Sequence, residues 1–558
     1  MPVVTLYADR LRTLVGGGIT FQQIVDKLPL LGVHIEEQAG DHVRVEYDPN
    51  RPDYSTDYGV ARSLRGSFGI ETGLPRHDLK GSTFRIEVDP SVKEVRPCIS
   101  GMLVKGLKLD DETIRQIISM QEDLCNGIGR KRHRLAIGIH NSDVVVPPLT
   151  YKAVPSSFRF VPLEHDRELS IEEILSSHPT GRKYGHLVSG HDLYPVITDS
   201  KGTVLSFPPI INGNATRVTT SSSNLFVDVT GAEPTVLEDA LAIMAEAFWD
   251  AGAEVHGIEV LDGAESFQAP DLSPSSMTVP ARAVSDLIGL SFKPSAIVSA
   301  LRRARFNASI VGSRVKVEIP RYRVDILHIV DVAEEVMYGY GFEKLEPDFT
   351  FVYTVGSLSP RTHLIEAIRR TAVGVGLQEV MGYSLTSKEV LYDRVHRPSD
   401  GAIKVAASKS ALFEYLKDMI VPTHLQLLAE NVQEAYPQNI FEVAEVFTPD
   451  PSAEAGVKED LHLAVALSDN AANFTDARSV LDTILLKTFA AKATYRRSSL
   501  PFLVEGRTAE CLLDDRPIGF VGEVDPKVII GFGLRAPVSV FEISLSSFFD
   551  KVAIKERV

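Results

Sequence analysis

The length of the chain constrains its fold more than any single motif does. The chain has 558 residues, and a domain usually holds about 150 residues around its own hydrophobic core. We therefore expect about three to five domains. Stretches with helical and with strand-like periodicity alternate along the chain, and glycine, proline and Asx residues separate them. This pattern predicts a multidomain protein that combines the α/β and α+β fold classes.

The first two predicted domains differ in size. Residues 1–85 indicate a small α/β domain, in which a turn at Asp48–Asp53 precedes a helix. Residues 86–265 indicate a longer mixed domain. Its clearest helix is Pro234–Gly252, because proline near the start, glycine after the end and an apolar stripe along one face are typical of helices.

The rest of the chain divides into a small and a large predicted domain. Residues 268–345 contain two short helices followed by a hairpin, the order found in winged helix-turn-helix modules. Residues 350–558 alternate between helices and strands. Among them are a helix at Ala411–Asn431 and a strand at Gln378–Ser384, and the alternation predicts a sheet covered by helices.

Charge and cysteine content argue against several classes of protein. The formal net charge is −16, which does not suit a surface devoted to nucleic acid but leaves room for a local basic patch. The three cysteines form no CxxC pair, so neither a thiolate zinc site nor a disulfide framework is expected. No secretion signal and no membrane-spanning apolar run is legible. These features predict a cytoplasmic protein.

Four carboxylates occur within eleven residues of the small predicted domain. They are Asp325, Asp331, Glu334 and Glu335. If a helix begins at Asp331, the last three lie near one face of it, and such a group of oxygens suits Mg²⁺. The spacing also allows Asp331 and Glu334 to form a capping box. In that case Arg321 or Arg323 would neutralise the other carboxylates.

A second candidate site lies between Leu205 and Thr230. Its polar residues are Ser206, Asn212, Asp228 and Thr230. Prolines stiffen the apolar strip from Ser206 to Asn212. Asp228 and Thr230 should point to the same side of a strand, because strand side chains alternate. Apolar walls with a few fixed polar groups suit a small aromatic amino acid that has one hydroxyl.

Structural roles explain these residues better than catalysis does when the sequence is taken alone. Asn212 suits a turn, and Asp228 suits a cap. No serine–histidine–aspartate arrangement is legible here, and His178 and His191 are typical of solvent-exposed or turn positions.

A basic run, Arg130–Arg134, places four fixed positive charges in five residues of an acidic chain. A solvated turn is the simplest interpretation. Contacts to nucleic-acid phosphates and a salt-bridged subunit interface are the alternatives.

Five groups of motifs resemble one protein family. In chain order they are Pro49–Asp53 with Gly59–Arg65, Ile128–Arg132 with Ala136–His140, Ser206–Asn212 with Asp228–Gly231, Arg323–His328 with Glu334 and Glu335, and Phe441–Phe447. Together they resemble the beta subunits of phenylalanine–tRNA ligases of the archaeal and eukaryotic type, and the archaeal form most closely. Each motif is weak alone, but the five keep their order over nearly the whole chain.

The resemblance implies a role for each predicted domain. Residues 86–265 would be the editing domain, which hydrolyses tyrosine wrongly joined to the phenylalanine tRNA. The small domain would be winged-helix-like and associated with Mg²⁺. Residues 350–558 would form an antiparallel sheet similar to that of class II synthetases, without catalysis. The implied editing residues are Ser206, Asn212, Asp228 and Thr230, and the implied magnesium ligands are Asp325, Asp331, Glu334 and Glu335.

The resemblance also implies a division of labour with a second chain. The predicted strand Asn439–Glu445 has no arginine, whereas class II synthetases use a strand arginine to hold the α-phosphate of ATP. Charging of tRNA with phenylalanine would then belong to an alpha subunit, in an α2β2 assembly. The extra tRNA-binding domains of the bacterial form are not expected.

Two alternatives belong to other functional classes. One is a stand-alone winged-helix protein that binds nucleic acid, against which the net charge of −16 counts. The other is a free-standing hydrolase of mischarged tRNA. The large terminal domain, with no chemistry of its own, fits an assembly surface better than it fits such a hydrolase.

Overall fold

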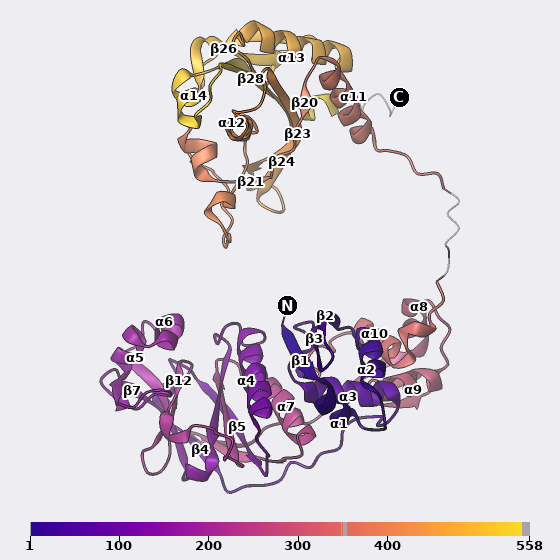
Figure 1. Cartoon of the computed structure of the whole chain (residues 1–558), viewed down its shortest axis with the longest axis vertical. Coiled ribbons are helices and arrows are strands. Elements are labelled where there is room, and N and C mark those ends of the chain that lie inside the picture. The colour runs from indigo at the N-terminus through magenta and orange to yellow at the C-terminus, as the bar shows by residue number, and fades with distance from the viewer. Residues whose placement is uncertain (1, 348, 350–353, 550–558) are drawn as a thin grey trace. The chain divides into compact units, whose positions relative to one another are not determined.

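The computed structural model describes residues 2–347, 349 and 354–549. The chain forms two compact units, residues 1–348 and residues 349–558, and Figure 1 shows the first from indigo to pink and the second ending in yellow. Both contain sheets with helices packed on them, so the predicted mixed multidomain fold is confirmed. Within the described residues, no helix is at once long enough and apolar enough to cross a membrane.

The N-terminal part of the first unit is a three-stranded antiparallel sheet with helices. The strands are β1 (Val3–Tyr7), β2 (His34–Gln38) and β3 (His42–Glu46), in the order β1-β3-β2. The helices are α1 (Ala8–Val15), α2 (Phe21–Lys27) and α3 (Asp57–Phe68). A buried 3-10 turn at Pro52–Ser55 leads into α3. Thr56 caps α3, because its side chain accepts a hydrogen bond from the N–H of Gly59.

The middle of the first unit contains two larger sheets. Their orders are β12-β11-β10-β7-β4-β15-β16 and β14-β5-β13-β6. The strands are β4 (Arg85–Val88), β5 (Cys98–Lys105), β6 (Leu135–Asn141), β7 (Leu149–Pro155), β10 (Leu193–Thr198), β11 (Val204–Phe207), β12 (Ile211–Asn212), β13 (Leu225–Gly231), β14 (Glu254–His256), β15 (Ile258–Asp262) and β16 (Glu265–Ala269). The helices are α4 (Asp111–Asn126), α5 (Ile171–Ser177), α6 (Pro179–Tyr184) and α7 (Pro234–Asp250).

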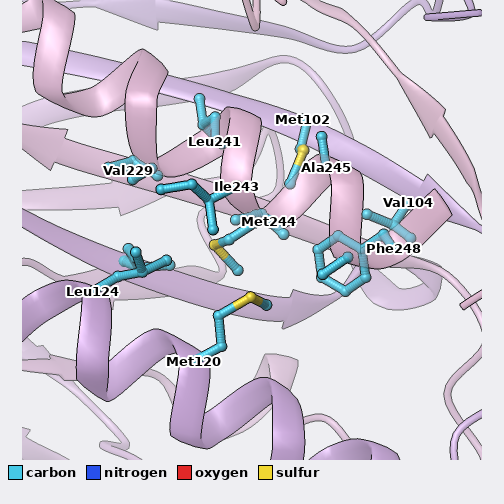
Figure 2. Close-up of a cluster of buried hydrophobic side chains, with 14 of the residues drawn as sticks. Met102, Val104, Met120, Leu124, Val229, Leu241, Ile243, Met244, Ala245 and Phe248 are labelled. Atoms are coloured by element: carbon cyan, nitrogen blue, oxygen red, sulfur yellow. The ribbon is translucent and has the colours of Figure 1, made fainter. Parts of the chain in front are cut away.

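The side chains on the two faces of the four-stranded sheet belong to two different hydrophobic cores. Met102 of β5 and Val229 of β13 belong to the core formed with α4 and α7, which Figure 2 shows. Phe226 of β13 belongs to the other core, with residues of the seven-stranded sheet. Because strand side chains alternate, Asp228 and Thr230 share the face of Phe226. They therefore point away from the helices and toward the second sheet.

A buried arginine joins the N-terminal part to α7. The guanidinium of Arg62, on α3, lies 2.6 Å from a carboxylate oxygen of Asp250 and 3.5 Å from one of Glu246. The same guanidinium stacks on Tyr322, 4.5 Å from the ring centre. Arg65 pairs with the second oxygen of Asp250 at 2.7 Å. The negative charges at the end of α7 are thus neutralised from α3.

The small C-terminal module of this unit has three strands and three helices. The strands are β17 (Ser275–Pro280), β18 (Asn307–Val311) and β19 (Arg314–Ile319), in the order β17-β19-β18. The helices are α8 (Ala281–Ile288), α9 (Pro294–Arg303) and α10 (Ile329–Tyr340). The two predicted helices and the hairpin are confirmed.

The second unit is built on a seven-stranded sheet. Its order is β20-β23-β24-β28-β27-β26-β25, with β20 parallel to β23 and the other neighbours antiparallel. The strands are β20 (Gln378–Glu379), β23 (Gln438–Pro449), β24 (Val457–Ser468), β25 (Thr494–Arg497), β26 (Leu503–Leu513), β27 (Arg516–Val524) and β28 (Val538–Ser544). Helices α11 (Pro360–Gly374) and α13 (Phe474–Phe489) cover one face. Helices α12 (Val421–Glu430) and α14 (Pro526–Phe532) cover the other.

Two predicted elements of the second unit are wrong in extent. The helix predicted at Ala411–Asn431 begins only at Val421, after a 3-10 turn and a short strand. Pro422 lies in its first turn, where a residue without an N–H is tolerated, and Glu542 accepts a hydrogen bond from the N–H of Val421 at 3.0 Å. The strand predicted at Gln378–Ser384 keeps its first two residues, which are those that pair with β23.

Candidate functional site

A cavity of about 450 Å³ lies at the β6 edge of the four-stranded sheet, and side chains from both faces of that sheet reach it. Side chains of α4, β6, β13 and the strip from β11 to β12 line it. The apolar lining includes Leu109, Ile114, Ile117, Ile118, Phe207, Pro208, Pro209 and Ile210, and the polar lining includes Gln121, Glu122, Arg132, His178, Ser206, Asn212, Thr216 and Asp228. An apolar cavity with convergent polar groups is the usual form of a small-molecule site.

The structure brings three of the four predicted editing residues to this cavity. Ser206, Asn212 and Asp228 line it, and Ser206 pairs with Asn212 across the β11–β12 hairpin. The side chain of Thr230 is engaged elsewhere. Its hydroxyl accepts a hydrogen bond from Nε of Arg96 at 2.9 Å, and Arg96 also donates to the carbonyl of Thr230 at 2.6 Å.

Among the described residues, the Ser206 hydroxyl is one of the cavity's polar groups without a hydrogen-bond partner, and Nε of Arg132 is another. The side chain of Ser206 is buried. An unsatisfied buried hydroxyl is uncommon, since nearly all buried polar groups in folded proteins have a partner. A hydroxyl that faces a cavity can find that partner in a bound molecule.

A histidine that the sequence did not single out lies behind the cavity. His140 is fully buried on β6, and its Nε2 lies 2.8 Å from Oδ2 of Asp228. Its Nδ1 lies 2.8 Å from Oγ1 of Thr216. No serine was expected to form an arrangement with histidine and aspartate in this segment, but the structure joins the hydroxyl of Thr216 to a histidine and an aspartate, because His140 comes from β6, which pairs with β13. His140 is the last residue of the Ala136–His140 motif, and its place in that motif is the sequence feature that could have indicated it.

His178 lies in the turn between α5 and α6, as one of the two predicted positions required, but it is buried rather than exposed to solvent. It is 9% exposed and lines the cavity. Its Nδ1 lies 2.8 Å from Oγ1 of Thr180. Burial, and then the nearby His165, lower the pKa of His178.

The basic run divides between solvent and cavity. Arg130, Lys131 and Arg132 all have positive φ angles, between 46° and 67°, a backbone conformation that costs non-glycine residues free energy and recurs near functional sites. Arg130 and Lys131 are exposed. Arg132 lines the cavity and donates to the carbonyls of Pro209 and Ile210, at 3.1 Å each. This arginine holds the proline strip, so it is not available as a free phosphate ligand.

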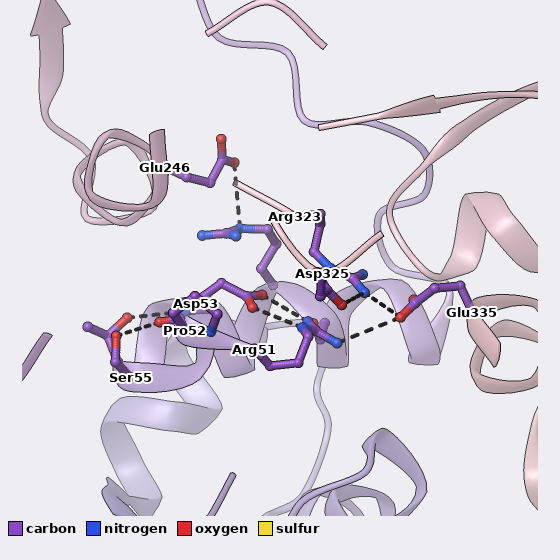
Figure 3. A network of polar contacts seen from close by, with 12 residues as sticks. Arg51, Pro52, Asp53, Ser55, Glu246, Arg323, Asp325 and Glu335 are labelled. Carbon is purple, nitrogen blue, oxygen red and sulfur yellow. Dashed lines mark hydrogen bonds and ion pairs between the residues drawn. The ribbon is translucent and has the colours of Figure 1, made fainter. Parts of the chain in front are cut away.

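Two of the four predicted magnesium ligands, Asp325 and Glu335, are paired with Arg323 (Figure 3). Arg323 donates to both oxygens of Asp325, at 2.9 and 2.7 Å, and forms an ion pair with Glu335. Asp331 accepts from the N–H groups of Leu327 and His328, both at 2.7 Å. The capping box therefore joins His328 to Asp331, and the predicted box of Asp331 with Glu334 is wrong.

These carboxylates do not fit a magnesium ion in the arrangement that the structure has. Asp325, Glu334 and Glu335 line one hollow of about 30 Å³, together with Arg51. The guanidinium of Arg323 takes the place of a cation between two of them. Within the part of the chain that is described, no three side chains of the ligand types are arranged to hold a metal. The magnesium role stays a prediction.

Two known families match consecutive parts of the chain. Residues 277–342 match the family described as "tRNA synthetase B5 domain". Residues 348–545 match the family described as "Phenylalanyl tRNA synthetase beta chain CLM domain".

Similar proteins match over nearly their whole length. The phenylalanine–tRNA ligase beta subunit of Archaeoglobus fulgidus is 40% identical over 553 residues, 99% of each chain. The beta subunit of Methanococcoides burtonii is 36% identical over 551 residues, which cover 98% of this chain and 100% of that one. Neither a stand-alone winged-helix protein nor a free-standing hydrolase is expected to match such subunits from end to end.

A solved structure supports the same relationship. The crystal structure of an N-terminal fragment of the phenylalanyl-tRNA synthetase beta subunit from Pyrococcus horikoshii aligns with a TM-score of 0.59 at 34% identity. The alignment covers 61% of this chain and 99% of the fragment. The chain therefore belongs to the family of phenylalanine–tRNA ligase beta subunits.

Proposed function

We propose that the cavity beside β13 is the proofreading site of a phenylalanine–tRNA ligase, where tyrosine wrongly joined to the phenylalanine tRNA is hydrolysed. The observation that carries the proposal is the cavity itself. It has apolar walls of the size an aromatic ring needs, and it is faced by the unsatisfied hydroxyl of Ser206 and the buried carboxylate of Asp228.

The chemistry of the substrates explains why such a ligase needs a second site. A pocket built for phenylalanine is apolar, and an apolar pocket cannot strongly reject an isostere that only adds a hydroxyl. A separate site with polar groups at the far end of the ring can bind that hydroxyl. Hydrolysis of the ester further requires a placed water and donors for the developing oxyanion. The terminal hydroxyl of the tRNA is a candidate to assist.

Ser206→Ala tests the proposal with little disturbance to the fold. Because the Ser206 hydroxyl has no partner among the described residues, its removal should leave folding stability nearly unchanged. A hydrogen bond made only to the substrate would be lost, which should slow hydrolysis of preformed tyrosyl-tRNA by about tenfold. The assay uses the chain assembled with its alpha subunit, since charging with phenylalanine must be followed in the same preparation.

Ser539→Ala is the matched control, because Ser539 of β28 is another buried serine whose Oγ has no partner among the described residues. We expect this variant to hydrolyse tyrosyl-tRNA at the rate of the unaltered enzyme. If Ser206→Ala also did so, then the cavity would not be the editing site.

The proposal also assigns different tasks to two subunits. This chain would assemble with an alpha subunit into an α2β2 enzyme that binds tRNA in the cytoplasm. The second unit resembles a synthetase sheet in its antiparallel pairing, but β23 has no arginine that could hold the α-phosphate of ATP. The adenylation chemistry therefore belongs to the alpha subunit. This chain supplies the proofreading site and an assembly surface.

Pyrophosphate exchange tests this division. The purified chain alone, given phenylalanine, ATP and Mg²⁺, should show no exchange above background. The chain mixed with its alpha subunit should exchange robustly. Exchange by the chain alone would show that the second unit has kept adenylation chemistry.

The magnesium prediction can be tested because a bound ion would compete with Arg323 for the carboxylates of Asp325 and Glu335. An ion at these carboxylates has to displace Arg323, which is paired with Asp325 and Glu335. Arg323→Met should therefore tighten Mg²⁺ binding, measured by calorimetry, and Glu335→Gln should weaken it, since a carboxylate ligand is lost. Equal and unsaturable binding by both variants and by the unaltered chain would contradict a magnesium site here.

A further inference from the structure

The polar groups of the cavity are organised by a residue that is not part of its lining. Thr216 and Asp228 both line the cavity, whereas His140 lies behind them and bonds to both. The three side chains come from separate segments: β6 for the histidine, β13 for the carboxylate, and the 3-10 turn Asn214–Thr216 for the hydroxyl. Each of the three residues is at most 1% exposed.

The surroundings allow this arrangement and hold it in place. Gly138 lies opposite Asp228 in the β6–β13 pairing. A methyl group on Gly138 would lie 2.2 Å from Oδ2 of Asp228 and 2.7 Å from Nε2 of His140. A glycine is therefore what leaves space for the pair. On the side of the core, the imidazole stacks on Phe226, with ring centres 6.1 Å apart.

The direction of the hydrogen bonds follows from what each group can donate. An ionised carboxylate only accepts, so Nε2 of His140 donates to Asp228. In a neutral imidazole the other nitrogen accepts, and the hydroxyl of Thr216 then donates its proton to Nδ1, 2.8 Å away, in preference to the carbonyl of Gly213 at 3.5 Å. The lone pairs of the Thr216 oxygen and the carboxylate of Asp228 remain as acceptors at the cavity. Their separation is set by the rigid ring between them.

We propose that His140 is a positioning residue that fixes Thr216 and Asp228 as a pair of acceptors for the phenolic hydroxyl of tyrosine. This inference rests on the proposed editing function. Tyrosine can donate the proton that such a pair needs, and phenylalanine cannot. Without the histidine, the carboxylate can turn and the two acceptors lose their fixed spacing, so discrimination should fall before the fold does.

Two substitutions of His140 separate positioning from general support of the fold. The amide nitrogen of glutamine reaches the place of Nε2 and can still donate to Asp228, whereas asparagine is shorter and reaches only the place of Nδ1. His140→Asn should slow hydrolysis of preformed tyrosyl-tRNA by about ten- to a hundredfold, the usual effect of a buried polar group left unpaired. His140→Gln should stay within about threefold of the unaltered enzyme, because the donor to Asp228 is kept and only the bond to Thr216 is lost, at the low end of the net contribution of one hydrogen bond.

The measurement is kcat and KM for tyrosyl-tRNA and phenylalanyl-tRNA hydrolysis by the assembled ligase, alongside charging with phenylalanine. Positioning predicts a lower kcat for tyrosyl-tRNA in His140→Asn, with an unchanged KM, unchanged charging and no fall in the slow hydrolysis of phenylalanyl-tRNA. Thr216→Val should show the same selective loss, and Thr216→Ser, which keeps the hydroxyl, should not. His256→Gln is the matched control, because His256 is also a buried strand histidine of this sheet, bonded to the carbonyl of Gly81.

Each outcome decides the proposal. Equal rates for His140→Asn, His140→Gln and the unaltered enzyme would overturn the role of His140 while leaving the editing function standing. Equal losses for both amides, or a loss of charging together with hydrolysis, would also overturn it in favour of structural support. An unaltered ligase that did not hydrolyse tyrosyl-tRNA would remove the editing function and this inference together.

Discussion

Replacing Glu442 with alanine should destabilise the second unit by about 3–5 kcal/mol, the usual effect of removing one partner of a buried ion pair. Lys417 and Glu442 are 1% and 3% exposed, and Nζ lies 2.8 Å from Oε1. His424, equally buried, lies 3.5 Å from the second oxygen. Without the carboxylate, the ammonium of Lys417 would remain buried and unpaired inside the sheet.

The same carboxylate gives the second unit an acid-sensitive stability. Burial alone would raise the pKa of Glu442, but His424 and Lys417 outweigh it and bring the pKa down to about 2, from an ordinary value of 4.5. Because the pKa of Glu442 is lower in the folded state than in the unfolded state, the ionised carboxylate contributes its full share of the folding free energy above pH 4.5. This share is lost as the pH falls toward 2. The Glu442→Gln variant should not show this part of the pH dependence.

Hydrogen–deuterium exchange in urea, followed in peptides from β23 and α12 of the full chain, measures the opening free energy of the second unit. Glu445→Ala is the matched control. Glu445 is on the same strand, but its pair with Arg361 is partly exposed, so its loss should change the free energy by less than about 1 kcal/mol. Lys417→Met with Glu442→Leu should recover most of the stability. A Glu442→Ala variant as stable as Glu445→Ala would mean that the pair contributes nothing.

The other large effect is expected at Asp228. Asp228→Ala removes a buried carboxylate of the cavity and leaves His140 without its acceptor. Hydrolysis of tyrosyl-tRNA by the assembled ligase should then slow by about a hundredfold, the upper end for an unpaired buried group. Net accumulation of tyrosyl-tRNA should rise, because charging takes place elsewhere, and charging with phenylalanine should be unchanged.

Asp199→Ala shows whether losing any buried carboxylate of this domain has the same effect. Asp199 is also buried, but it accepts from the N–H groups of Val146, Lys201 and Thr203 and does not belong to the cavity. We expect it to lower thermal stability and to leave the hydrolysis rate per folded enzyme intact. Parallel losses of hydrolysis in the Asp199 and Asp228 variants would assign Asp228 a structural role.

Local sequence patterns predict which segments form strands and helices, but they do not predict which strands lie next to each other in a sheet. The alternation in Leu225–Thr230 predicted β13 and the shared face of Asp228 and Thr230. It could not show that β6 lies beside β13, because strand order depends on contacts between distant segments. The sequence therefore does not predict that His140 lies 2.8 Å from Asp228. For the same reason, the engagement of Thr230 by Arg96 was not predicted.

Charge runs were the least informative signal. Arg132 belongs to a run of four cations, yet three consecutive positive φ angles turn its side chain toward the carbonyls of the proline strip. The four carboxylates of the small module suggested a metal, and arginine neutralisation was the alternative. The structure has Arg323 between Asp325 and Glu335. Opposite charges from distant segments cannot be matched by spacing alone.

The ion pairs of Arg62 with Glu246 and Asp250 limit which fragments of this protein can fold. Glu246 and Asp250 belong to a helix of the proposed proofreading domain, but the guanidinium that neutralises them comes from the N-terminal part of the chain. A fragment that started after residue 85 would leave both carboxylates without Arg62 and Arg65, and would expose the face of α7 that packs on α3. Gene truncation or proteolytic nicking between these parts should therefore yield an insoluble or poorly folded proofreading domain, whereas a fragment that keeps the N-terminal part would retain Arg62 and Arg65 as partners of Glu246 and Asp250.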